Sequence, residues 1–116
     1  MRGASGVGSG IPVESTTPGM AIVLVDGENV RRSLWPNMPR TELIERSQAW
    51  GERHGHDVDV VWEGKATADD EIARRAAELQ GDVWVVTSDR GLRERVADHV
   101  GRVIGGGSFA RELRAD

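Results

Sequence analysis

The stretch AIVLVDGEN, residues 21–29, decides the fold. Its first five residues form an unbroken apolar run rich in β-branched side chains, which is typical of a strand buried on both faces of a parallel sheet. Asp26 follows this run directly, and a polar turn is expected at 26–29. Two later segments also place acids beside apolar elements, TADDEI around Asp69 and VWVVTSDR around Asp89. Because parallel strands end at one edge of their sheet, these carboxylates are expected to meet there.

A shared site for these carboxylates needs a positive occupant, because like charges that crowd together repel one another. The simplest occupant is a hard cation such as Mg²⁺ or Mn²⁺, which prefers oxygen ligands. In sites of this kind its most common partner is a phosphate group. The acids therefore favour a metal site that acts on phosphate chemistry.

Helical phase places two of the acids on inward faces. Asp69 precedes Ile72 by three residues, and Asp89 precedes Leu92 by three, so each shares a side with apolar residues of its helix. Asp26 follows a strand and opens no recognisable helix. An acid at a helix start is, taken singly, more often a cap than a ligand. The coincidence of all three favours a functional site.

Composition limits the classes of protein that remain. The chain has 116 residues, no cysteine and a formal net charge of −4. One small domain is expected, and disulfide scaffolds, thiolate zinc sites and cysteine nucleophiles are excluded. The charge argues against a globally basic nucleic-acid surface, so phosphate binding would rest on local arginines. No apolar run approaches the roughly 20 residues of a membrane span, so a cytoplasmic protein without a membrane partner is expected.

The chain divides near Met20. Residues 1–19 are rich in Gly, Ser, Thr and Pro and are expected to be a disordered tail, a cloning remnant, or an extension upstream of a natural start at Met20. Residues 20–116 alternate strands and helices, which predicts an α/β domain: a three-layer, Rossmann-like sandwich around a small, mostly parallel sheet of about four strands. Strands are predicted at 21–25, 58–62, 83–87 and 102–104, an irregular segment at 31–40, and helices at 41–54, after Thr67, after Asp89 and from Ser108.

The aromatic residues divide into two groups. Trp50, Trp62 and Trp84 lie in predicted regular elements and are expected in the core. Trp35 and Phe109 are the residues that would stack on unpaired bases, as aromatic side chains do in single-strand binders.

Five segments in order, VDGEN, VVWEG, TADDEIARRA, VVTSDRGLRERV and GGGSFARELRAD, resemble the YacP-like NYN domains, a branch of the PIN-like nucleases. The match covers nearly everything after Met20. Related nucleases that act on 5′ flaps also carry an alanine and two aspartates at the start of a helix. The resemblance implies a PIN-like fold and a metal-dependent ribonuclease, with endonucleolytic cleavage of RNA by a water that Mg²⁺ or Mn²⁺ activates.

The resemblance also assigns residues. Asp26, Asp69 and Asp89 match the family's metal-binding, catalytic carboxylates. Asp70 stands as a second carboxylate beside Asp69, and Glu63 falls where relatives often have an acid after the second strand. The residues expected to bind or position RNA, from the family motifs or from arginine chemistry, are Asn29, Ser88, Arg31, Arg32, Arg90 and Ser108.

Two other functions stay open at this stage. The loop between Glu63 and Thr67 is short, which permits a catalytically silent RNA-binding module of the same fold. A phosphatase or phospho-acceptor domain with Asp26 as nucleophile is a more distant alternative, since Glu28 replaces its second aspartate and Lys65 is the only lysine. The residues leave open whether the RNA is single-stranded or structured, whether DNA is also a substrate, and whether a ribosome or a regulatory protein directs the activity.

Overall fold

A single sheet of four parallel strands organises residues 20–115, which the computed structural model describes; the tail predicted at 1–19 lies outside them. Strand β1 (Ile22–Asp26) pairs with β2 (Asp57–Val61) on one side and with β3 (Val83–Val86) on the other, so Ile22 lies between Asp57 and Val83. The predicted central position of the first apolar run is thus confirmed. The strand order is β2, β1, β3 and β4 (Arg102–Ile104).

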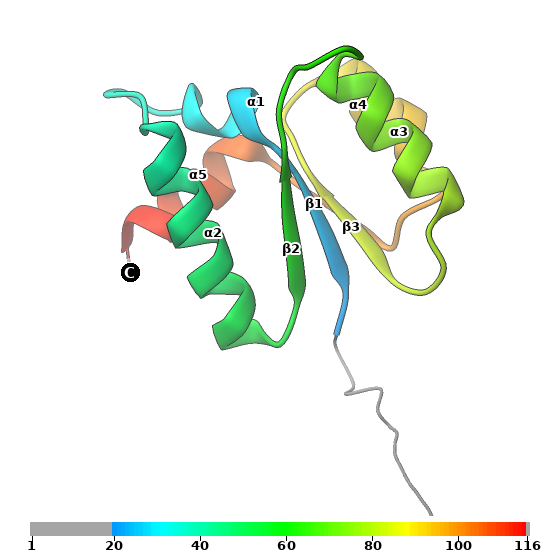
Figure 1. Ribbon diagram of the computed structural model, residues 1–116, viewed down its shortest axis with the longest axis horizontal. Coiled ribbons are helices and arrows are strands. Elements are labelled where there is room, and N and C mark those ends of the chain that lie inside the picture. Colours follow the sequence, from blue (N-terminus) through cyan, green and yellow to red (C-terminus); the bar gives the residue numbers. More distant parts are fainter. Residues whose placement is uncertain (1–19, 116) are drawn as a thin grey trace, which may run out of the picture.

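Helices cover both faces of the sheet and complete three layers (Figure 1). Along β1, Val23 and Val25 face one apolar core while Leu24 faces the other, because successive side chains of a strand point to opposite faces. This alternation explains the unbroken apolar run and confirms the α/β sandwich. Helices α1 (Gly27–Arg31), α2 (Arg40–His54) and α5 (Gly106–Ala115) cover the first face, and α3 (Ala68–Glu78) and α4 (Arg90–Val96) the second.

The ends of two helices follow the predicted local chemistry. Gly55 ends α2 in the left-handed conformation, with φ of 74°, which costs glycine little. The Thr67 hydroxyl accepts a hydrogen bond from the backbone N–H of Asp70 at 3.1 Å and caps α3. Both predictions are confirmed. The Thr67 cap fixes the start of α3 shortly after the end of β2.

Two predicted boundaries are wrong. Residues 26–29 are not a turn, because α1 begins at Gly27 directly after β1. Glycine is required there, since a Cβ at this position would lie 2.6 Å from the Trp62 ring. The last helix begins at Gly106 rather than Ser108, because the Gly106 N–H donates to the Ser88 hydroxyl at 2.8 Å and fixes the first turn.

The aromatic predictions divide. Trp50 is buried, and Trp62 and Trp84 pack against the same core, as expected. Phe109 is fully buried on the inward face of α5, so the base-stacking role predicted for it is wrong. Trp35 is 86% exposed and stays a candidate for such a role.

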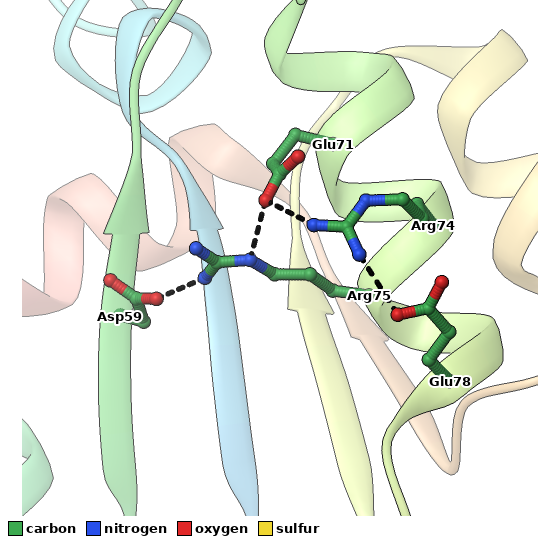
Figure 2. Close-up of polar contacts among 5 residues, drawn as sticks. All are labelled: Asp59, Glu71, Arg74, Arg75 and Glu78. Atoms are coloured by element: carbon green, nitrogen blue, oxygen red, sulfur yellow. Dashed lines mark hydrogen bonds and ion pairs between the residues drawn. The ribbon is translucent and has the colours of Figure 1, made fainter.

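An ion-pair network fastens the outer surface of α3 to the edge of the sheet (Figure 2). Arg75 bonds to Asp59 of β2 and to Glu71, and Arg74 bonds to Glu71 and Glu78. These pairs lie at the surface and are exposed or half-buried, so each stabilises the fold by only about 0–1 kcal/mol. The charged residues on the outer surface of α3 are therefore members of surface ion pairs.

None of the helices between residues 20 and 115 has the length and apolarity that crossing a membrane requires.

Candidate active site

A hollow of ≈460 Å³ lies at the carboxyl edge of the sheet, and we call it the acid hollow. The ends of β1 and β3 and the starts of α1, α3 and α4 meet there, as a parallel sheet places its sites. The three predicted catalytic aspartates all line it. The full lining is Asp26, Glu28, Asn29, Arg32, Ser33, Glu63, Asp69 and Asp89.

Asp26 is the most buried acid of the hollow. Its residue is 5% exposed, and its Oδ2 accepts a hydrogen bond of 2.9 Å from the Thr87 hydroxyl. Burial raises the pKa of Asp26, and the negative charges of Asp69 and Asp89 raise it further, while the Thr87 hydrogen bond lowers it. The hydroxyl therefore favours the ionised carboxylate in a place that otherwise disfavours it.

Asp69 is the second residue of α3 and is half-buried. Burial raises its pKa first, and the nearby charges of Asp89 and Glu63 raise it next, with Arg95 opposing them. Two carboxyls with raised pKa values in one hollow are typical of functional sites. The predicted inward position of Asp69 agrees with this geometry.

Asp89 lines the hollow but is exposed, so its predicted inward position is wrong. It is the N-cap of α4, and its Oδ1 accepts a hydrogen bond from the backbone N–H of Leu92 at 2.9 Å. Helical phase fails here because the cap residue has extended backbone angles and precedes the helix. The capping role and a place in the hollow therefore coexist at this residue.

Glu63 joins the loop after β2 to the start of α3. Its Oε2 accepts a hydrogen bond from the backbone N–H of Ala68 at 3.1 Å, directly before Asp69. This contact holds the loop at the end of β2 against α3, the helix that supplies Asp69. Glu63 thus lies where the sequence predicted an additional carboxylate.

Asn29 and Ser88 tie three elements together beside the hollow. The Asn29 Oδ1 accepts from the backbone N–H of Ser88 at 2.9 Å, and the Ser88 hydroxyl accepts from that of Gly106 at 2.8 Å. A Cβ at position 106 would lie 2.4 Å from Asn29 Oδ1, so only glycine fits. These two positioning residues hold α1, the end of β3 and the start of α5 in register.

Five predicted residues do not line the acid hollow: Asp70, Arg31, Arg90, Ser88 and Ser108. Asp70 is exposed and pairs with Arg95 at 2.9 Å, because its side chain leaves α3 on the outer side. Arg31 pairs with Glu28 at 3.4 Å. Arg90 lines a neighbouring hollow together with Ser88, and Ser108 is an exposed residue of α5.

Glu28 is the centre of a small arginine cluster. Arg31, Arg32 and Arg40 all approach its carboxylate, at 3.4, 3.1 and 2.7 Å. Three cations around one carboxylate leave this rim of the hollow with a surplus of positive charge. Arg32, which lines the hollow as predicted, is 67% exposed and can reach toward solvent.

The donor chemistry of the hollow fits a hard cation. Its acids offer carboxylate oxygens, which Mg²⁺ and Mn²⁺ prefer, and Asp26, Asp69, Asp89 and Glu63 are the residues that would hold the ion. Between residues 20 and 115, no three acid or histidine side chains are already close enough to form a finished metal cluster. The carboxylates would therefore have to draw together around the ion.

One residue of the site was not identified from the sequence. Thr87 is fully buried, donates to Asp26 and accepts the backbone N–H of Asp89 at 3.1 Å, so it links two of the acids. Its position in the sequence could have indicated this role, because Thr87 follows the strand that lies beside β1 and stands two residues before Asp89.

The distant phosphatase alternative gains no support from this geometry. That chemistry needs a lysine near the reacting aspartate, and the only lysine, Lys65, lines a different hollow between β2 and α3. Asp26, the residue that would be the nucleophile, is almost fully buried.

Comparisons with known proteins agree with the fold. No family model and no curated protein sequence matches the chain. The structure is similar to the crystal structure of a single-residue variant of Rae1 (YacP) from Bacillus subtilis, with a TM-score of 0.69 and 23% sequence identity. The match covers 81% of this chain and 74% of that one. The resemblance predicted from the sequence is confirmed at the level of the fold: the chain has a YacP-like fold.

Proposed function

We propose that the protein is a metal-dependent ribonuclease that cleaves RNA within the strand. The observation that carries this proposal is the gathering of Asp26, Asp69 and Asp89 in one hollow at the carboxyl edge of the sheet. Burial and mutual charge raise the pKa values of Asp26 and Asp69, a cost that a divalent cation would offset. The YacP-like fold supports the same function, because the sequence resemblance implies nuclease activity for such domains.

The residues of the hollow divide the work of phosphodiester hydrolysis. When bound, Mg²⁺ or Mn²⁺ would supply an activated water for attack at phosphorus and would offset the charge that develops on the leaving oxygen. Asp26, Asp69 and Asp89 would hold the ion, and Glu63 would complete the donor set. Thr87 favours the ionised form of Asp26 and orients its carboxylate through a 2.9 Å hydrogen bond.

The rim of the hollow would bind the sugar–phosphate chain. Arg32 lines the acid hollow, and Arg90 lines the neighbouring hollow that Ser88 also lines. An arginine guanidinium can donate hydrogen bonds to two phosphate oxygens at once. A protein with a net negative charge would depend on such local contacts to bind phosphate. Asn29 and Ser88 would fix the position of these elements rather than take part in the chemistry.

Cleavage of end-labelled RNA tests the proposal. The full chain is incubated with single-stranded RNA or DNA in Mn²⁺, Mg²⁺ or EDTA, beside Asp26→Asn and the surface variant Asp98→Asn, purified identically. Metal-dependent RNA cleavage that Asp26→Asn abolishes and Asp98→Asn retains is the expected result. Equal cleavage by all three proteins, or cleavage in EDTA, would refute it and would indicate a contaminating nuclease.

A silent RNA-binding module is the second candidate, and two observations favour it. The acids form no finished metal cluster within residues 20–115, and one oxygen of Asp89 is already used as a helix cap. This candidate predicts RNA binding that persists in EDTA and in Asp26→Asn, with no cleavage under any metal condition. The same experiment therefore distinguishes the two.

A further inference from the structure

Trp35 is an exposed aromatic side chain that the fold does not use. Four large apolar side chains are exposed between residues 20 and 115, and Trp35, at 86%, exceeds the others by a wide margin. Exposing so large an apolar surface is unfavourable in water. An exposed tryptophan is therefore more informative than an exposed leucine. The other three are Met20 at 50%, Ile44 at 38% and Leu79 at 37%.

The segment that carries Trp35 is anchored on both sides. Before it, Leu34 packs against the core, and after it Met38 is 1% exposed and donates its backbone N–H to the Arg31 carbonyl at 3.0 Å. The Pro36 carbonyl accepts a hydrogen bond from Arg114 of α5. The indole is thus held outward by an ordered segment, which lowers the entropy cost of binding a ligand against it.

The position of Trp35 favours a nucleic-acid ligand. Arg32 and Ser33, which line the acid hollow, come directly before Leu34 and Trp35. The side chains of Arg32 and Arg40, which flank this segment in the sequence and both pair with Glu28, are 67% and 61% exposed. A single aromatic face among cations fits a base and its phosphates, whereas a protein interface usually has a larger apolar core.

We propose that Trp35 stacks on an unpaired base next to the scissile phosphate and so selects single-stranded RNA. This inference rests on the proposed function, because it names the substrate class of the same hollow. In a duplex each base is already stacked between its neighbours, so its face is not available to the indole. Stacking also tolerates any base identity, so the expected preference is for strand state rather than for sequence.

Binding measured without cleavage tests this inference. Asp26→Asn serves as the host so that the RNA stays intact, and Trp35→Ala, Trp35→Phe and Leu79→Ala are added to it. Fluorescence anisotropy gives Kd for a labelled single strand of about 12 nucleotides and for the same strand in a duplex, at a fixed salt concentration. Leu79 is the matched control because it is an exposed apolar residue at the opposite end of the sheet.

The expected result is specific to the aromatic face. Trp35→Ala should weaken single-strand binding about 5- to 150-fold, the equivalent of about 1–3 kcal/mol, with the duplex little affected. Trp35→Phe should restore most of the affinity, and Leu79→Ala should change nothing. Equal Kd values for Trp35→Ala and the host, equal losses for strand and duplex, or no RNA binding at all would overturn the inference. So would a Trp35-dependent change in oligomeric state with RNA binding unchanged, which would assign the residue to a protein interface.

The inference and the proposed function can fail separately. Metal-dependent cleavage that is equally fast in Trp35→Ala would leave the nuclease proposal intact and refute the stacking role. Trp35-dependent binding without any cleavage would do the reverse and favour the silent module. Thermal unfolding of Trp35→Ala should match the parent, because the side chain makes little contact with the fold.

Discussion

Replacing Thr87 by valine removes the hydroxyl that joins two acids of the hollow and keeps nearly the same shape. Thr87 is fully buried, so water cannot easily replace the hydrogen bonds that its two partners lose. Asp26 Oδ2 loses a 2.9 Å donor, and the Asp89 N–H loses a 3.1 Å acceptor. A hydrogen bond to a charged group contributes about 1.5–3 kcal/mol. A total loss of about 2–3 kcal/mol is expected when Asp26 is ionised, which lowers Tm by roughly 10–20 °C for a domain of this size.

The loss should depend on pH in a defined direction. The Thr87 hydrogen bond stabilises the ionised carboxylate and so lowers the pKa of Asp26, against the larger raising effect of burial. The valine variant is therefore most destabilised at pH 8, above the raised pKa. As pH falls through that pKa toward about 4, the carboxyl takes up a proton and the difference from the parent shrinks to about 1 kcal/mol.

Thermal unfolding of the parent, Thr87→Val and Thr87→Ser at both pH values measures this effect. The serine variant keeps the hydroxyl and separates the hydrogen bond from the lost methyl group. A double-mutant cycle with Asp26→Asn isolates the pairwise contribution. A loss below about 0.5 kcal/mol at pH 8, or a loss that is the same at both pH values, would refute the role assigned to this hydroxyl.

Three further outcomes follow from the site. Asp26→Asn should raise Tm at pH 8, because a neutral side chain avoids the free-energy cost of burying a charge, which is the main cause of the raised pKa of Asp26. An unchanged or lower Tm would contradict this. Asp89→Asn should keep the α4 cap while Asp89→Ala loses about 1 kcal/mol, measured by urea unfolding; equal losses would exclude capping. Gly106→Ala should cost about 1–3 kcal/mol, because its Cβ would meet Asn29 Oδ1 at 2.4 Å, whereas Gly107→Ala, with 3.6 Å of space, should be tolerated; equal stability would disprove the close packing.

The sequence predicted the sheet well because hydrophobic pattern and strand packing agree here. The run at 21–25 is apolar on both sides because β1 is covered by helices on both faces. Strong local signals such as Gly55 and Thr67 also placed helix ends correctly. In each case the information lies in neighbouring residues, so no tertiary contact was needed to find it.

The errors arose where tertiary contacts decide. The early start of α5 depends on Ser88, which is distant in sequence from Gly106. Phe109 was misassigned because a lone aromatic after a glycine triplet gives no sign of the face it will occupy. Asp70 and Asp69 are adjacent, and only the packing of α4 shows that Asp70 pairs with Arg95 while Asp69 lines the hollow.

The role of Thr87 illustrates a different limit. A threonine at the end of a strand is common, and its hydroxyl gains meaning only from the register that brings β3 beside β1. The three aspartates were predicted to meet because their types and order are informative on their own, and they line one hollow. The residues that support them were harder to find, since their function lies in their partners.

The central claim is that the acid hollow holds a divalent cation. Calorimetric titration of the full chain with Mn²⁺ tests it most directly, with Asp26→Asn as the disrupting variant and the exposed Asp98→Asn as the matched control. The account predicts saturable binding by the parent and Asp98→Asn, lost in Asp26→Asn and weakened on acidification, because a proton competes for Asp26 and Asp69, whose pKa values are raised. No saturable binding by the parent, or binding that Asp26→Asn retains, would contradict it.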